Sequence, residues 1–219
     1  MRLSKEFLFL GFIKIDPPRE RIYRRLGYKD GITKILPNQK REIDEYINLS
    51  LSYIDLKGLG VSVPIKKING SKIFLEQEGF LESRDLIKLL KGCDEVLFMG
   101  ATAGRKIIEV IQSDLRGEDL MRAVVLDAVA SEMVDASLDW IRLQINNILA
   151  NRKKYVINKR FSCGYGDFLL ENQKQIFHIL EMERLGVNIT DTYFLIPEKS
   201  VTALSGIKRL PKNKKSEKI

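Results

Sequence analysis

Histidine, cysteine and long apolar runs are scarce in this chain of 219 residues, and each scarcity argues against a class of protein. His178 is the only histidine, so we expect neither a Ser-His-Asp triad nor a histidine-based metal site. Cys93 and Cys163 lie far apart and form no C-x-x-C pair, which argues against a disulfide framework or a zinc site. No apolar run reaches the roughly 18 residues of a membrane span, and no signal-peptide cleavage pattern is apparent. We therefore expect a reduced, cytoplasmic protein that does not enter a membrane.

Charge is abundant but unevenly placed. The net charge is +8, and residues 208–219 alone hold six Lys/Arg against one Glu. Charged chain ends are usually just solvated, so this basicity does not indicate a nucleic-acid-binding surface. We expect one folded domain over residues 1–207, a basic and flexible tail over 208–219, and no nucleic-acid partner.

The hydrophobic pattern predicts an α+β protein. Strands arranged as hairpins alternate with helices, which favours a single domain with a mixed, mostly antiparallel twisted sheet and a long central helix. Asn69-Gly70 is a two-residue hairpin turn, and Asn38 and Ser83 are candidate helix caps. Strands are expected at 7–15, in the 61–77 hairpin, and at 93–101, 155–161, 188–197 and 199–207. Helices are expected at 19–28, 38–55, 84–92, 102–115, 118–152 and 171–186.

The longest expected helix carries one polar stripe. In "LDAVASEMVDASLDWI", residues 126–141, most positions are apolar, whereas Asp127, Ser131, Asp135 and Asp139 recur every four residues. Residues spaced by four lie on one helix face, and like charges there repel one another. The stripe therefore either lies at the surface or borders a polar cavity.

The stretch "RFSCGYGDF", residues 160–168, is the strongest candidate for a binding loop. Arg160 offers a fork of donors suited to a carboxylate, and Gly164 allows the backbone to approach a ligand closely. Tyr165 can present its ring face to a cation. Such a loop suits a zwitterionic ligand with a flat or cationic part. Equally, Arg160 could pair locally and the glycines could form a simple turn.

A second loop, "GATAGR" at residues 100–105, connects an expected strand to an expected helix. Helix N-termini of this kind can bind anions. Two glycines without a phosphate-binding signature are more often a tight turn with close packing.

Several motifs in the C-terminal half carry a family resemblance. The pattern R-x-x-x-G-Y at 160–165 is followed by "ENQKQIFHILEMERLGVNITDTYFLIPEKSVTALSG". This order resembles the end of the activation domain of cobalamin-dependent methionine synthase. There, an Arg-Pro-Ala-x-Gly-Tyr-Pro loop precedes a helix, and a Pro followed by Ser-Val-Ser-Gly comes later. The polar-striped helix 126–141 also looks like the family's Ala-rich acidic helix. The clear resemblance runs from Leu126 to Gly206.

The resemblance implies a binding site for S-adenosylmethionine. Arg160, Cys163, Gly164 and Tyr165 fall in the family's binding loop, and Asp135 falls on a ligand-proximal glutamate of the long helix. By the same resemblance, Arg160 would meet the methionine carboxylate or fix the loop. Tyr165 and Asp135 would compensate the charge of the sulfonium or amino group.

The implied reaction is reductive reactivation. Inactive cob(II)alamin on a partner chain takes one electron from a flavodoxin-like donor, and the resulting cob(I)alamin accepts the methyl group of S-adenosylmethionine. No proton moves, so no catalytic residue is expected in this chain. The chain would then be the reactivation subunit of a split methionine synthase, working with a cobalamin-binding subunit. Two alternatives stay open: a non-catalytic partner subunit of a corrinoid protein, and a small-molecule or anion-binding domain using the Gly100–Arg105 loop.

Overall fold

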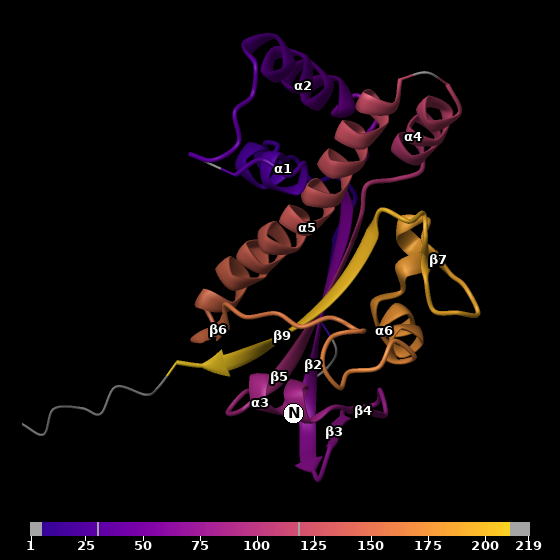
Figure 1. Ribbon diagram of the computed structural model, residues 1–219. Helices are drawn as coiled ribbons and strands as arrows, with labels where there is room; N and C mark the ends of the chain where they lie inside the picture. The colour runs from indigo at the N-terminus through magenta and orange to yellow at the C-terminus, as the bar shows by residue number, and fades with distance from the viewer. Residues whose placement is uncertain (1–5, 30, 118, 211–219) are drawn as a thin grey trace, which may run out of the picture.

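An antiparallel sheet with helices on both faces forms the body of the protein (Figure 1). The computed structural model describes residues 6–29, 31–117 and 119–210. The strands are β1 (Glu6–Leu10), β2 (Lys57–Asn69), β3 (Lys72–Leu75), β4 (Phe80–Glu82), β5 (Glu95–Thr102), β6 (Lys154–Val156), β7 (Asn188–Ile189), β8 (Leu195–Ile196) and β9 (Ser200–Arg209). The helices are α1 (Arg19–Arg25), α2 (Pro37–Ser50), α3 (Arg84–Leu89), α4 (Lys106–Arg116), α5 (Leu120–Ala150), α6 (Asn172–Leu180) and the 3₁₀ helix η1 (Met182–Leu185).

The main sheet has seven strands in the order β4-β3-β2-β5-β9-β6, and β1 also pairs with β2. Each of these pairings is antiparallel. The α+β fold with a long central helix is thereby confirmed. Within the described residues, no helix is both long enough and apolar enough to cross a membrane.

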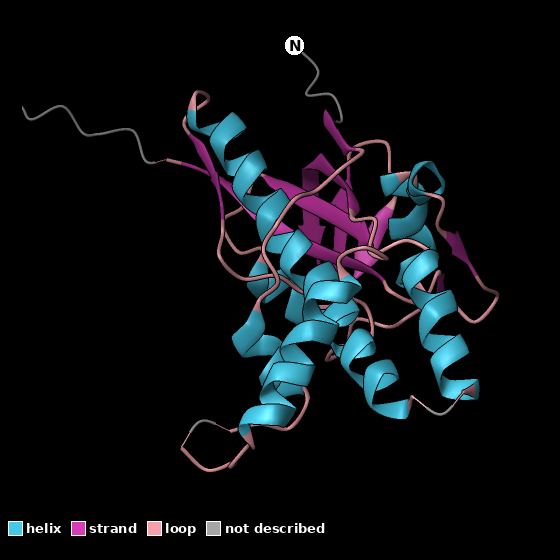
Figure 2. Ribbon diagram, turned by 90° about the horizontal axis from the view of Figure 1, so that it is seen from above, coloured by secondary structure: helices cyan, strands magenta, loops and turns pink. Residues whose placement is uncertain are grey.

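The alternating side chains of β5 divide the core into two halves. Leu97 and Met99 point to the face covered by α1, α2, α4 and α5, whereas Val96 and Phe98 point to the face covered by α3 and α6. Successive side chains of a strand lie on opposite faces, and β5 is buried along its whole length, so it contributes to both halves. Figure 2 shows α5 running across the sheet.

Close approach of α5 to β2 depends on glycine. A Cβ atom at Gly60 would lie 2.4 Å from Cδ1 of Ile145 on α5. A side chain at this position would require Ile145 to shift, so glycine allows the helix to pack directly on the sheet. This contact fixes the helix that carries the polar stripe.

Several expected boundaries were wrong. The strand expected over 7–15 ends at Leu10. Helix α2 starts at Pro37 with Leu36 in the cap position, so Asn38 is inside the first turn and does not cap it. Proline suits the first helical position because its missing N–H has no partner there anyway. The helix expected from residue 102 begins only at Lys106, because β5 continues to Thr102.

The C-terminal elements also differ from expectation. In place of the single strand expected over 188–197, the structure has two strands, β7 and β8, of two residues each. The strand expected over 155–161 ends at Val156. Helix α6 stops at Leu180 because Glu181 adopts a left-handed backbone with φ of 54°. Strand β9 extends through Arg209, so the start of the expected tail belongs to the sheet. The rest of the tail, 211–219, lies outside the described residues.

Candidate ligand site at the 160–168 loop

The 160–168 loop is tied to the sheet by backbone hydrogen bonds. Phe161 and Leu204 of β9 exchange two N–H to carbonyl bonds, of 2.8 and 2.7 Å. The Gly164 N–H donates to the Phe168 carbonyl at 2.8 Å, which closes a tight turn. Gly164 has a φ of 85°, a region that favours glycine. Its missing Cβ would face open space, so the glycine is required for the turn itself and not to avoid a clash.

Asp167 anchors the far end of this loop to helix α3. Its carboxylate accepts hydrogen bonds from the Ser83 hydroxyl, from the Arg84 N–H at 2.8 Å and from the Asp85 N–H at 3.2 Å. Ser83 also accepts from the Leu86 N–H at 2.9 Å, which confirms it as the cap of α3. The Ser83 hydrogen bond, helped by the two backbone donors, lowers the pKa of Asp167. The loop is therefore held at both ends.

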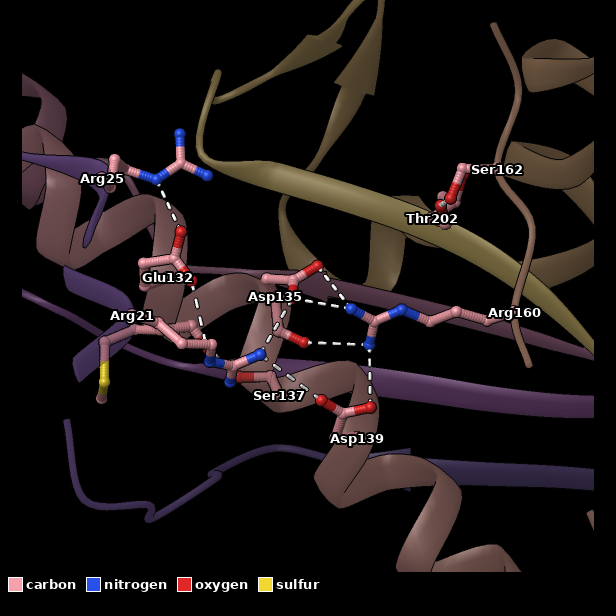
Figure 3. A network of polar contacts seen from close by, with 10 residues as sticks. Arg21, Arg25, Glu132, Asp135, Ser137, Asp139, Arg160, Ser162 and Thr202 are labelled. Carbon is pink, nitrogen blue, oxygen red and sulfur yellow. Dashed lines mark hydrogen bonds and ion pairs between the residues drawn. The ribbon is translucent and has the colours of Figure 1, made fainter. Parts of the chain in front are cut away.

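Arg160 is engaged by the acidic stripe of α5 (Figure 3). Its Nη2 donates to both carboxylate oxygens of Asp135, at 2.7 and 2.6 Å. Its Nη1 donates to Asp139 Oδ1 at 3.0 Å and to the Asp135 carbonyl at 3.3 Å. Of the two roles expected for Arg160, the structure shows it fixing the loop to the helix.

Helix α1 supplies two further arginines that the sequence did not suggest. Arg21 lies 3.3 Å from Asp135, 3.6 Å from Asp139 and 3.7 Å from Glu132. Arg25 pairs with Glu132 at 2.6 Å. Three guanidinium groups and three carboxylates therefore form one network, which removes the repulsion expected within the stripe. No local signal could have found this pairing, because α1 and α5 are distant in the sequence.

A cavity of about 620 Å³ lies beside this network. Asp135, Arg160, Cys163 and Tyr165 all line it, so the structure brings together four of the five expected site residues. Gly164, the fifth, lies between two of them in the loop. The cavity is also lined by residues of the segment 193–202, which contains β8 and the start of β9. Ligand pockets usually measure about 300–1,000 Å³, so the volume suits a small organic molecule.

The loop side chains contribute different surfaces to the cavity. The thiol of Cys163 is nearly buried, and burial raises its pKa to about 12. It is therefore neutral near pH 7 and unsuited to act as a nucleophile. Tyr165 is 67% exposed, and Phe194, which also lines the cavity, is exposed as well. The cavity thus has an aromatic rim.

Polar residues of the cavity wall outside the predicted set include Gln173 and Thr202, which are bonded to each other. Gln173, in the first turn of α6, is buried and lines the cavity. Its Oε1 accepts a hydrogen bond from the Thr202 hydroxyl of β9 at 3.0 Å. A signal was present, because Gln173 shares helical spacing with Ile176, Phe177 and Leu180 and so falls on the apolar face.

The other candidate loop, Gly100–Arg105, is a close-packed turn. The Asp55 N–H donates to the Ala103 carbonyl at 2.9 Å, and a Cβ atom at Gly104 would lie 3.2 Å from that of Asp55. The Thr102 hydroxyl accepts from the Gly104 N–H at 3.2 Å. These contacts fit the structural interpretation of the loop better than an anion site.

The fold can now be compared with solved structures. The structure of the MetH reactivation domain bound to AdoHcy superposes with a TM-score of 0.66, over 96% of this chain and 80% of that chain. The two sequences are 11% identical, so the likeness establishes the fold. The resemblance to the methionine synthase activation domain is thereby confirmed at the level of structure. No protein-family model and no curated protein matches the chain.

Proposed function

We propose that this chain binds S-adenosylmethionine in the cavity beside the 160–168 loop. The observation that carries the proposal is the convergence of Asp135, Arg160, Cys163 and Tyr165 on one cavity of suitable volume. The similar MetH reactivation domain is bound to AdoHcy, the demethylated form of the same molecule. The binding loop is preorganised by its hydrogen bonds to β9 and to α3, which reduces the entropic cost of holding a ligand.

The charge of the cavity suits a cationic sulfonium. Arg160 is neutralised by Asp135 and Asp139, so it adds no free positive charge to the wall. Glu198 also lines the cavity and forms no ion pair with any other described residue. The aromatic ring of Tyr165 offers a face on which a cation is stabilised. We therefore expect S-adenosylmethionine to bind more tightly than S-adenosylhomocysteine, whose thioether sulfur carries no charge.

In this proposal the chain is the reactivation subunit of a split cobalamin-dependent methionine synthase, working in the cytoplasm. The cobalamin belongs to a separate subunit, and a flavodoxin-like protein supplies one electron to it. This chain would hold the sulfonium so that its methyl group faces the corrinoid subunit, which then receives the methyl while the thioether leaves. Positioning of this kind needs no general base in the present chain.

A second candidate function follows from the ion pairs of Arg160. Because Asp135 and Asp139 occupy its guanidinium group, Arg160 is not available to bind a ligand carboxylate unless those contacts open. A chain with its loop arginine committed in this way could serve as a non-catalytic cap on a corrinoid protein. The two functions differ in whether this chain alone binds S-adenosylmethionine.

Calorimetric titration of S-adenosylmethionine into the chain separates these two functions. We expect a Kd near or below about 10 µM, or about −7 kcal/mol. Tyr165→Ala should weaken binding roughly 3- to 10-fold, the contribution of about 0.5–1.5 kcal/mol typical of an aromatic contact. Phe12→Ala is the matched control, because Phe12 is an aromatic residue with 70% exposure that does not line the cavity.

Absence of heat in the wild-type titration would favour the non-catalytic cap. The same titration is then repeated with the cobalamin-carrying subunit present. Binding that appears only in the mixture would indicate a site completed by the partner. If the mixture also fails to bind, the reactivation function is wrong for this chain.

A further inference from the structure

Gln173 carries a buried amide nitrogen that no other described group satisfies. Its side chain is only 6% exposed, and Nε2 has no hydrogen-bond partner among the described residues. Buried side-chain donors are nearly always paired, and an unpaired one destabilises the folded state. A chain that keeps such a group in the wall of a cavity has a ready donor for a ligand.

The position of this amide is well defined. The Gln173 N–H donates to the Leu170 carbonyl at 2.8 Å, which fixes the backbone at the start of α6. At the other end of the side chain, the Thr202 hydroxyl holds Oε1 at 3.0 Å. Thr202 is itself fixed, because its carbonyl accepts from the Ser162 hydroxyl at 2.8 Å. All three of Gln173, Thr202 and Ser162 line the cavity, so the amide belongs to a polar wall built from three separate segments.

An amide in this state presents a specific pattern of hydrogen-bonding groups. Nε2 has two hydrogens to donate, and Oε1 keeps one lone pair after accepting from Thr202. A donor and an acceptor side by side are the groups with which Gln reads adenine, donating to N7 and accepting from the 6-amino group. The rings of Tyr165, Tyr193 and Phe194 also line the cavity and offer faces on which a purine can stack.

We propose that Gln173 is the residue that selects adenine in this cavity. The inference rests on the proposed function, since adenine is the base of S-adenosylmethionine, and it adds the residue and the edge of the base that are recognised. Nε2 is covered by neighbouring atoms, so this recognition requires the amide to rotate toward the cavity when the purine binds. The 6-oxo base hypoxanthine would present an acceptor to Oε1 and would be rejected.

The test compares two ligands whose bases differ in the substituent at position 6 and in the proton on N1. S-adenosylhomocysteine and S-inosylhomocysteine are titrated into the full chain, together with free adenosine to detect recognition of the nucleoside alone. A bidentate contact discriminates between bases by about 1–3 kcal/mol, so we expect roughly 5- to 150-fold tighter binding of the adenine compound.

Gln173→Met keeps the length of the side chain and removes both polar groups. This variant should bind S-adenosylhomocysteine about as weakly as the wild type binds S-inosylhomocysteine. Its affinity for S-inosylhomocysteine should be nearly unchanged. Gln173→Glu keeps an acceptor for the 6-amino group but cannot donate to N7, so it should weaken binding of both compounds and keep the adenine preference. Gln175→Met is the control on the same helix, because Gln175 donates to the Glu78 carbonyl outside the cavity. Circular dichroism verifies that each variant is folded.

The outcomes distinguish this inference from the proposed function. If the wild type binds both compounds equally, or if Gln173→Met keeps the adenine preference, the role of Gln173 is wrong while ligand binding stands. If the wild type binds neither compound, the proposed function fails and the inference fails with it. A preference lost in Gln173→Met and kept in both Gln173→Glu and Gln175→Met supports the inference.

Discussion

Removal of the Arg160 guanidinium should destabilise the protein even without a ligand. Arg160→Met keeps most of the aliphatic stem and removes the hydrogen bonds to Asp135 and Asp139. Hydrogen bonds to charged groups contribute about 1.5–3 kcal/mol when buried, whereas exposed ion pairs contribute about 0.2–1 kcal/mol. The side chain of Arg160 is 25% exposed, and those of Asp135 and Asp139 are 38% and 47% exposed. We therefore expect an intermediate loss of about 2 kcal/mol.

Urea unfolding of the whole chain, followed by circular dichroism, measures this loss. In thermal unfolding it should appear as a decrease in Tm of about 4–8 °C for a domain of this size. A double-mutant cycle with Asp135→Asn isolates the pair, and we expect a coupling energy of about 1–2 kcal/mol. Arg41→Met is the control, because Arg41 is an exposed arginine on α2.

Salt provides a second check on the same pair. Partly exposed charges are partly screened, so the coupling energy should fall between 0.05 and 0.5 M NaCl, which we take as about a threefold change in Debye length, without vanishing. A coupling energy below about 0.5 kcal/mol at low salt, or equal losses in Arg160→Met and Arg41→Met, would show that Arg160 does not hold the loop to α5.

Three further outcomes follow from the structure. Gly60→Ala should cost about 1–3 kcal/mol in urea unfolding, because its Cβ would lie 2.4 Å from Cδ1 of Ile145; an unchanged midpoint would contradict the close packing of α5. Iodoacetamide should modify Cys93 before Cys163 in peptide mapping of the native chain, because burial raises the pKa of the Cys163 thiol to about 12. Asp167→Asn should lower Tm at pH 7. The pKa of Asp167 is lowered in the fold, so its contribution is present above about pH 4 and the gap to wild type should close as the pH falls below that value.

The parts of the fold that the sequence predicted are those set by local pattern. The apolar run of β5 and the hairpin signal of Asn69-Gly70 have physical causes within a few residues, and both the strand and the hairpin are found. The turn is shifted by one residue from the prediction, because Asn69 pairs with Lys72 and the two turn residues are Gly70 and Ser71. The errors fall where tertiary contacts decide. Strand β6 is short because its continuous pairing with β9 stops after Val156, and the chain pairs with β9 again at the Phe161–Leu204 bridge, next to Arg160 and its contact with α5.

In the candidate site, too, signals within one segment were predicted and contacts between distant segments were not. The R-x-x-x-G-Y pattern located the loop, and the four-residue spacing located the acidic stripe, because both signals lie in contiguous sequence. The pairing of Arg160 with Asp135 required the fold, since it joins segments 25 residues apart. Arg21 is even further from its partners, 114 residues from Asp135. Ion pairs between distant segments produce no periodic pattern that a single sequence could show.

Arg160 and Gln173 should have opposite signatures, because the fold satisfies one and leaves the other open. The guanidinium of Arg160 is already paired with carboxylates of the chain, so its removal should mainly reduce stability and weaken binding only through a looser loop. The amide nitrogen of Gln173 has no partner among the described residues, whereas Oε1 accepts from the Thr202 hydroxyl. Gln173→Met therefore removes an unpaired donor but also leaves the Thr202 hydroxyl without its acceptor, so the two effects on stability oppose each other while affinity should fall. Measuring the Tm of each variant without ligand, and its Kd for the ligand, separates an effect on stability from an effect on binding. If Gln173→Met lost stability and kept affinity, the amide would be a structural group, and recognition of the ligand would have to come from the aromatic rim and the loop backbone.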